Sequence, residues 1–141
     1  MDESALTPAQ SLALARLDAA IDEVVAAGLD PAAIGESNAL TRGLERSRRR
    51  LDSAGAELVG AMERSKVFAV DGHRSAKSHL VRVARVSDVE AGRRVREARA
   101  LWVLPSVGKA FAAGDMGRCQ LNRITRVLGN RRVRERFVQL D

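Results

Sequence analysis

The chain has 141 residues, of which 45% are hydrophobic and 30% are charged, and its formal net charge at neutral pH is +6. That length and composition are typical of a soluble globular protein with one modest core. The single cysteine, Cys119, excludes an internal disulfide bond, so the composition gives no indication of an oxidising compartment.

The N-terminus and the apolar runs argue against secretion and membrane spanning. Asp2 and Glu3 stand where a secretory signal needs positive charge. The longest apolar run, residues 100–104, is far too short to cross a bilayer. We therefore expect a cytoplasmic protein without a membrane partner.

Charge is distributed unevenly along the chain. Residues 1–40 carry seven acidic side chains against one basic side chain, whereas residues 41–141 carry 23 basic against 11 acidic ones. This pattern indicates an anionic partner, most simply nucleic acid, or an N-terminal segment that folds back on the basic part. Because 21 of the 24 basic residues are arginine, the coding bias of a GC-rich genome is an equal alternative explanation.

The first predicted helix runs from about Thr7 to Ala27. Thr7 and Gln10 form a capping box with Pro8 at the first helical position, and Gly28 is the expected stop. Its apolar residues at helical spacing are Leu14, Leu17, Ile21 and Val24. Residues 29–37 form a connector.

A long helix is predicted from about residue 38. Its apolar stripe consists of Leu40, Leu44, Leu51, Leu58 and Met62. Leucine at every seventh position favours pairing with another helix, from this chain or from a second copy, so we keep a homodimer as an alternative to intrachain packing. The three arginines at 48–50 point in directions about 100° apart and form no single patch.

Two helices joined by a short turn follow the Asp71-Gly72 turn. The first spans about residues 75–84, with Ala76, Leu80 and Val83 on one side. A capping box of Ser87 and Glu90 opens the second, which ends near Trp102. We expect Ala91, Val95, Ala98 and Trp102 to form its buried stripe.

The remaining chain predicts three shorter helices and no strand. Leu104-Pro105 ends the preceding helix, a short helix stops at Gly114, and Asp115 is expected to cap the next. That helix carries Leu121, Ile124 and Leu128, and the last segment carries Val133, Phe137 and Leu140. The absence of a terminator at Asp141 indicates a cut inside a longer protein. The predicted fold is all-α, a multi-helix bundle with one long helix and a helix-turn-helix-like pair.

An ordered set of residues resembles a known family. The set is Val70, Asp71, Gly72, His73, Arg74, Ser75, Ala76, Leu80, Val86, Ser87, Glu90, Ala91, Arg93, Arg94, Val95, Ala98, Arg99, Leu101, Leu104, Pro105, Ala113, Gly114 and Gln120. It resembles the N-terminal region of actinobacterial HNH endonuclease-type proteins, a region called domain of unknown function 222. The chain departs from that pattern at His79, where an aromatic residue is usual, and at Arg85, where glycine often allows a tight turn.

The resemblance implies a division of the chain and of its chemistry. Residues 1–37 form an acidic helix and connector, and residues 38–141 form the domain that resembles the family, truncated before a C-terminal HNH nuclease domain. A divalent metal is implied only in that missing domain. The present segment is then non-catalytic, and cleavage by the parent protein depends on residues beyond Asp141.

No constellation in the sequence itself indicates catalysis or a cofactor. His73 and His79 are six residues apart without a third ligand at matching spacing, so we interpret them as a turn residue and a helix-packing residue. Cys119 has no Cys-x-x-Cys partner. Gly108-Lys109 follows no strand, which excludes a phosphate-binding loop, and no small-molecule substrate is evident.

The helix pair is the remaining functional candidate. Its second helix places Arg93, Arg96 and Ala100 on an expected outer face, as in helix-turn-helix proteins that contact DNA. The candidate nucleic-acid-binding residues are Arg82, Arg85, Arg93, Arg94, Arg96 and Arg99. The competing interpretation is a solvated surface of intrahelical ion pairs.

A second basic cluster lies near the end of the chain, at Arg131, Arg132, Arg134 and Arg136. We favour an outer face whose helix packs inward through its apolar residues, over a guide for nucleic acid. The alternative function for the whole segment is a helical protein-protein interaction or dimerisation module without nucleic-acid affinity.

Overall fold

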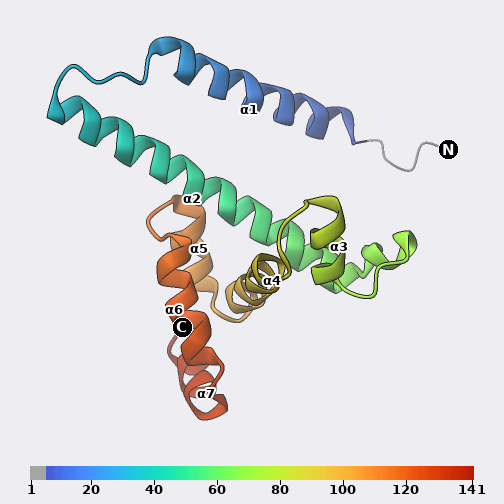
Figure 1. The fold of residues 1–141 in the computed structure, drawn as a ribbon. Helices are drawn as coiled ribbons and strands as arrows, with labels where there is room; N and C mark the ends of the chain where they lie inside the picture. Colours follow the sequence, from blue (N-terminus) through green and yellow to red (C-terminus); the bar gives the residue numbers. More distant parts are fainter. Residues whose placement is uncertain (1–5) are drawn as a thin grey trace. The chain divides into compact units, whose positions relative to one another are not determined.

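The structure, a computed structural model, describes residues 6–141, and in that range its regular elements are all helices, with no strand (Figure 1). Its elements are α1 (Pro8–Ala27), α2 (Ile34–Ser65), the 3-10 helix η1 (Val67–Asp71), α3 (Ala76–Val83), α4 (Asp88–Val103), α5 (Pro105–Ala113), α6 (Arg118–Leu128) and α7 (Arg131–Leu140). This confirms the predicted all-α fold with one long helix. Asp2 and Glu3, which we used to argue against secretion, lie outside the described residues.

The chain divides into two compact units, Met1–Gly43 and Leu44–Asp141, and α2 passes from the first into the second. Among residues 6–141, no helix combines the length and the apolar content that crossing a membrane requires.

The predicted boundaries of α1 are confirmed. The Thr7 hydroxyl accepts a hydrogen bond from the backbone N–H of Gln10 at 3.2 Å, and the Gln10 side chain accepts one from the N–H of Thr7 at 2.9 Å. Gly28 ends the helix with φ of +100°, a conformation that glycine adopts without steric cost. The apolar stripe of α1 nevertheless stays exposed at Leu14, Leu17, Ile21 and Val24.

Packing of the predicted apolar stripe of α2 within the chain is confirmed for Met62, which is 8% exposed, and is wrong for three of its leucines. Leu51 and Leu58 are 53% and 62% exposed, and Leu44 is also exposed. The helix buries Met62 of that stripe together with Ala56, Val59 and Gly60, which lie on a neighbouring face. Val59 and Met62 pack in one core cluster with residues of α3 and α4, and Ala56 packs in a second cluster with residues of α4, α5 and α6.

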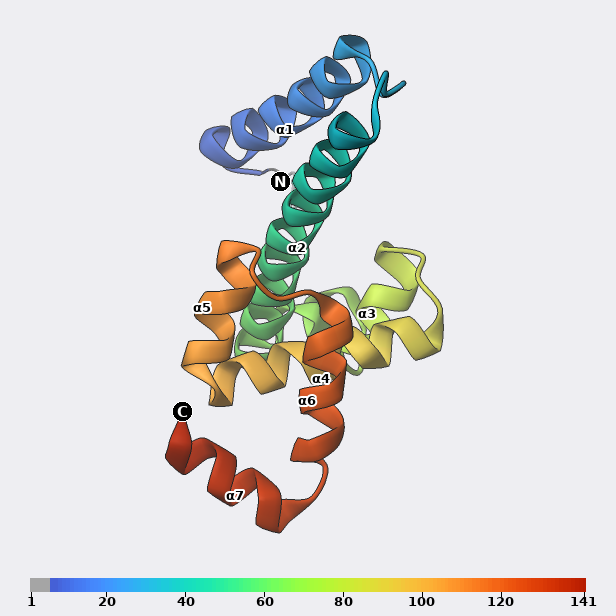
Figure 2. The ribbon, with the colours of Figure 1, turned by 90° about the vertical axis from the view of Figure 1, so that its left-hand side faces the viewer.

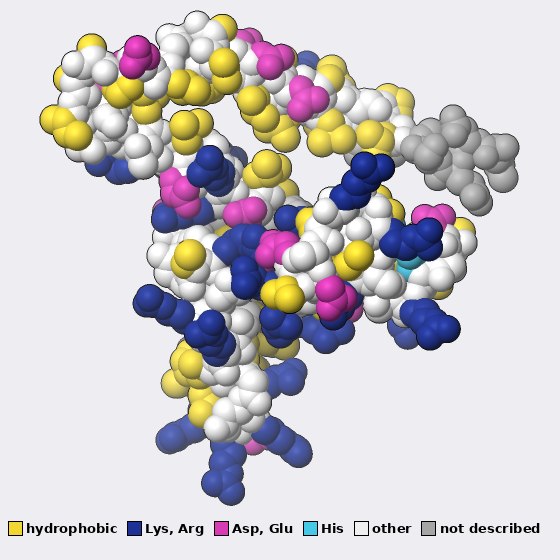
Figure 3. Space-filling model, viewed as in Figure 1, with side chains coloured by type: hydrophobic (Ala, Val, Ile, Leu, Met, Phe, Trp, Pro, Cys, Tyr) yellow, Lys and Arg dark blue, Asp and Glu magenta, His cyan; other side chains and the backbone are white. Residues whose placement is uncertain are grey.

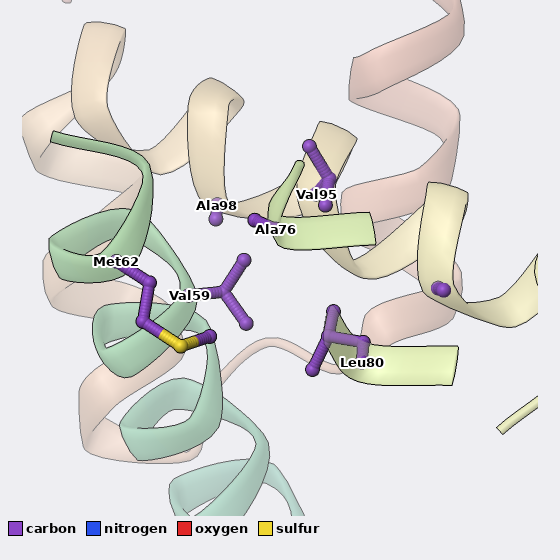
Figure 4. Packing of buried hydrophobic residues seen from close by; sticks show 7 residues of the cluster. Val59, Met62, Ala76, Leu80, Val95 and Ala98 are labelled. Atoms are coloured by element: carbon purple, nitrogen blue, oxygen red, sulfur yellow. The ribbon is translucent and has the colours of Figure 1, made fainter. Parts of the chain in front are cut away.

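One core cluster joins α2 to the helix pair (Figure 4). Its buried members are Val59, Met62, Ala76, Leu80, Ala91, Val95 and Ala98. A fully buried Leu or Val contributes roughly 1.5–3 kcal/mol, so this small cluster fixes α3 against α4 and α2. Val83, which we expected on the buried side of α3, is 61% exposed because it lies in the last turn of α3.

A second core cluster lies beside the first. Ala56, Ala100, Phe111 and Leu121 come from α2, α4, α5 and α6, and each is buried. Figure 2 shows α4 running from α3 towards α5, with α6 crossing it. Contacts on several sides make α4 the central helix of the unit Leu44–Asp141.

The start of α6 differs from the prediction. The helix begins at Arg118 after Gly117, and Asp115 does not cap it. The Gln120 side chain accepts a hydrogen bond from the Gly117 N–H at 3.0 Å and so satisfies one free donor of the first turn. Asp115 instead follows Gly114 in the turn that ends α5, where its N–H donates to the Ala110 carbonyl.

Candidate nucleic-acid interface

The turn between α3 and α4 is tight although it has Arg85 at the position where the resemblance led us to expect glycine. Arg85 adopts a left-handed conformation with φ of +54°, which costs a non-glycine residue about 1–2 kcal/mol. Ser87 then caps α4, because its hydroxyl accepts the N–H of Glu90 at 3.1 Å. Arg85 therefore does not prevent the short connection of a helix-turn-helix-like pair.

The six candidate arginines differ in how far they are already paired. Arg93 and Arg94 both contact Glu90, at 3.6 and 3.0 Å. Arg99 donates two hydrogen bonds to Glu63, at 2.7 and 2.9 Å. The three others are Arg82, Arg85 and Arg96, which have exposed side chains and no ion pair within residues 6–141.

Two residues of α4 differ from the prediction in their burial. Ala100, expected on the outer face, is 4% exposed because α6 covers that side of α4 and Phe111 of α5 packs in the same cluster. Trp102, expected in the buried stripe, is 65% exposed. It lies one turn past Ala98, which shares a core cluster with Ala76, the first residue of α3, so α3 does not extend far enough to cover it.

The exposed face of α4 carries arginines at Arg93, Arg96 and Arg99 and leads into an open cleft with a volume of about 520 Å³. Four arginines and one tryptophan line this cleft, together with Glu63: Arg64, Arg96, Arg99, Arg134 and Trp102. The Arg64 guanidinium lies 4.2 Å from the centre of the Trp102 ring, a cation–π contact. We call this set the arginine cleft.

Sequence reasoning missed two members of the arginine cleft, Arg64 and Trp102, and did not place Arg134 beside them, because α2, α4 and α7 bring these residues together from distant parts of the chain. Trp102 was assigned to the core by its helical spacing alone. Arg134 belongs to the second basic cluster that the sequence showed, whereas Arg64 carries no sequence signal that distinguishes it from the other arginines. Figure 3 shows how Lys and Arg side chains gather over α3–α7 and project from α7.

A buried ionic cluster holds α6 against α4. Arg118 on α6 contacts Glu90 at 2.7 Å and Glu97 at 3.0 Å, and Glu97 is only 2% exposed. Burial raises the pKa of Glu97, and Arg118 limits that rise. Burial also acts to raise the pKa of Glu90, but hydrogen bonds from Arg118 and Arg94 outweigh it and hold that pKa below its ordinary value. The cluster is thus part of the scaffold that positions α4.

The two other arginine runs behave differently. On α7 the expected inward packing is only partial, since Val133 is half-buried while Phe137 and Leu140 are 41% and 86% exposed. In the 48–50 run, Arg49 is half-buried and its guanidinium lies 3.4 Å from the Gly114 carbonyl, whereas its two neighbours are exposed. The three side chains thus form no common patch, as predicted.

The histidines lie together, with a third metal-ligating residue that sequence spacing did not indicate. The rings of His73 and His79 meet edge to face with centres 5.1 Å apart, and the Asp71 carboxylate lies beside them. Cys119 is exposed. Among residues 6–141, Asp71, His73 and His79 are the three metal-ligating side chains whose potential ligand atoms all lie within 4.8 Å of one another.

The comparisons with known proteins identify a family. No curated protein and no solved structure is significantly similar to the chain. The model of one family, described as a domain of unknown function (DUF222), matches residues 37–134, which include α3–α6, the arginine cleft and the histidine cluster. Because this match covers more than half of the chain, the protein belongs to the DUF222 family.

Proposed function

We propose that this chain is the non-catalytic, DNA-binding N-terminal region of an HNH endonuclease-like protein. The observation that carries the DNA-binding part is the exposed arginine row of α4, Arg93, Arg96 and Arg99, which leads into the arginine cleft. The nuclease association is supported by the resemblance of residues 70–120 to the N-terminal regions of HNH endonuclease-type proteins. The region contributes binding and orientation in this proposal, and the parent's nuclease domain contributes cleavage.

The chemistry of the arginine row suits a phosphate backbone. Arginine presents a planar fork of donors that matches phosphate oxygens, and phosphate contacts supply most of the affinity of proteins for DNA. The Arg93–Glu90 contact of 3.6 Å is partly exposed, and surface pairs of this kind contribute only about 0–1 kcal/mol. Arg93 can therefore exchange Glu90 for a phosphate at little cost, and Arg96 needs no exchange.

Titration of the 141-residue chain with a fluorescently labelled random DNA duplex, followed by anisotropy at two salt concentrations, tests the proposal. We expect binding that weakens steeply as salt rises, because neutralised phosphates release counterions. The double variant R93A/R96A is expected to bind more weakly. It should also flatten the dependence of log K on log salt by about 0.9 for each phosphate that it no longer neutralises.

The matched control removes the same charge from another surface. Arg123 and Arg126 are exposed on α6 and do not line the arginine cleft, so R123A/R126A is expected to retain most of the affinity and the salt dependence. Equal loss in both double variants would show attraction by net charge alone. Unchanged affinity in R93A/R96A would exclude the α4 face as the binding surface.

The exposed seam of α2 favours a second candidate function, self-association into a homodimer. Leucines at 44, 51 and 58 alternate with small residues at 47, 54 and 61, and all six are exposed, which is the a and d pattern of a coiled coil. We call these six positions the α2 seam. It lies opposite the face that buries Ala56, Val59 and Gly60.

Charges beside the seam specify how a second copy would lie. Arg50 and Glu57 are exposed, share one flank and have no ion pair within residues 6–141. In an antiparallel pair with each leucine over a small residue, Arg50 of each copy lies beside Glu57 of the other. In a parallel pair it would face the uncharged Gly55. The charges therefore favour an antiparallel homodimer.

Charge exchange tests the dimer by sedimentation velocity across a concentration series. We expect R50E to weaken dimerisation, because it places like charges together, and the exchanged variant R50E/E57R to restore it. R42E reverses a charge away from the seam and should dimerise as the unchanged chain does. A chain that is monomeric at every concentration, or an R50E/E57R variant that stays monomeric, would contradict this arrangement.

A further inference from the structure

The chain reverses direction between η1 and α3, and this reversal brings together three metal-ligating side chains. Asp71 is the last residue of η1, and Gly72 turns the backbone with φ of +77°. The N–H of His73 donates to the Phe68 carbonyl at 3.2 Å and fixes the residue after the turn. Because helical side chains tilt towards the helix N-terminus, His79 on the first turns of α3 leans back towards the same turn.

The three side chains of the cluster place potential metal-ligand atoms close to one another. One carboxylate oxygen of Asp71 and one ring nitrogen each of His73 and His79 lie within 4.8 Å of one another. The two rings meet at an interplanar angle of 88°, so their edges approach without stacking. The Nδ1 atom of His79 is shielded from solvent and has no hydrogen-bond partner within residues 6–141. A buried polar atom without a hydrogen-bond partner is unfavourable, because it has lost its contacts with water.

We propose that Asp71, His73 and His79 bind one divalent transition-metal ion, with Zn²⁺ the best match. Imidazole nitrogens suit zinc, and two histidines with one carboxylate are a known three-ligand set that leaves the fourth position to water. Tetrahedral ligands about 2.0–2.1 Å from zinc lie about 3.4 Å from one another, so side-chain rotations suffice to close the set.

This site is distinct from the metal that the family resemblance implies for a nuclease domain. It lies within the chain itself, at the start of the helix pair, and it joins residues that only the turn connects. A bound ion would link η1 to α3 and so restrict the motion of these two elements, which precede α4. Its effect on the isolated chain is therefore stabilisation, which can be measured without any enzymatic activity.

Titration of the full chain, prepared without a histidine tag, with Co²⁺ and then with competing Zn²⁺ tests the site. We expect one equivalent of Co²⁺ to give the visible absorption of a four-coordinate ion and Zn²⁺ to displace it. The chain has only two histidines and one cysteine, so NMR of the imidazole nitrogens assigns the ligands directly. Zn²⁺ is expected to shift the signals of both histidines and to raise the midpoint of thermal unfolding.

Variants separate this site from adventitious binding. D71N and H79Q are each expected to lower the affinity for Zn²⁺ at least about tenfold, the smallest loss usual even for outer-shell partners. D115N, which removes an exposed carboxylate elsewhere, and C119S, which removes the only thiol, should bind as the unchanged chain does. Circular dichroism without metal checks that each variant is folded, and H73Q replaces H79Q if that variant loses helicity.

Three results would overturn the proposal. One is that no Co²⁺ or Zn²⁺ binds at submillimolar concentration in the folded chain. Another is that D71N binds as tightly as the unchanged chain, because a three-ligand site requires the carboxylate. Loss of Zn²⁺ binding in C119S would also contradict the proposal, because it would show that the ion binds at the Cys119 thiol.

Discussion

The variant R118A is expected to destabilise the unit Leu44–Asp141 by about 3–5 kcal/mol, the cost of removing one partner from a buried ion pair. Arg118 contacts Glu90 at 2.7 Å and Glu97 at 3.0 Å, and it is the partner that compensates the charge of the almost fully buried Glu97. Alanine would leave that carboxylate inside the protein without a counter-charge. It would also remove the contact by which α6 is held to α4.

The pH dependence of unfolding distinguishes this cause from a simple loss of packing. Glu97 already has a raised pKa in the folded chain, and loss of Arg118 raises it further, so the folded state binds more protons than the unfolded state above pH 4.5. The stability of R118A is therefore expected to fall as pH rises through the interval between the unfolded and folded pKa values. Urea denaturation followed by circular dichroism at several pH values measures it.

The control for this experiment is another arginine on the same helix. Arg123 is exposed on α6, and R123A is expected to change stability by no more than about 0.5 kcal/mol. A similar, small change in R118A would show that Glu97 is protonated or hydrated in the folded chain and that the ion pair contributes little. A large loss that does not vary with pH would assign the effect to packing instead.

Local signals predicted several helix boundaries because each acts over a few residues. The Thr7 capping box forms as the sequence indicates, and Gly28 and Gly114 end their helices with positive φ. Such features depend on backbone geometry and on hydrogen bonds three or four residues apart. They are therefore readable without knowing what packs against the helix.

Local signals failed at the start of α2, which begins at Ile34 and not near residue 38, and at the start of α6, which Asp115 does not cap. Of the capping box predicted at Ser87, only the bond from the Glu90 N–H to the Ser87 hydroxyl forms, because the Glu90 side chain pairs with Arg93, Arg94 and Arg118.

The covered face of a helix depends on its partners, and the sequence pattern misassigned it twice. The leucines at 44, 51 and 58 are the most hydrophobic choice for a core on α2, yet the core clusters take Ala56, Val59 and Met62 from this helix. Trp102 continues the buried stripe of α4 beyond the point where a partner helix exists. The periodicity of apolar residues indicates which side of a helix is apolar. The positions and lengths of the neighbouring helices determine how much of that side is buried.

The functional candidates show the same limit. The arginine row on α4 was predicted because its members belong to one helix. Contacts between Arg118 and Glu97, or among Asp71, His73 and His79, depend on turns and on packing between helices, and no spacing rule specifies them. The sequence indicated which side chains are present, whereas the tertiary structure determined which of them meet.

The variant G114A is expected to lose about 2–4 kcal/mol of stability. Gly114 lies in the loop between α5 and α6, where contact with α2 restricts which residue fits. Gly114 has φ of +82°, which strains any residue with a Cβ atom. That Cβ would also lie 2.7 Å from Cγ of Arg46 and 3.2 Å from its carbonyl oxygen on α2. The N–H of Gly114 donates to the Phe111 carbonyl, so the loop has little freedom to move away.

Gly108 provides the matched substitution in the same helix, and the two variants together test whether the loop is docked on α2. A Cβ there meets only the Leu101 carbonyl oxygen at 3.6 Å, an ordinary contact, so G108A is expected to stabilise by about 0.5–1 kcal/mol through helix propensity. Thermal unfolding of both variants measures the difference. If G114A loses only about 1–2 kcal/mol, backbone strain alone accounts for the effect and the loop does not press against Arg46. A larger loss of stability in G114A means that a Cβ atom at position 114 also clashes with Arg46 on α2.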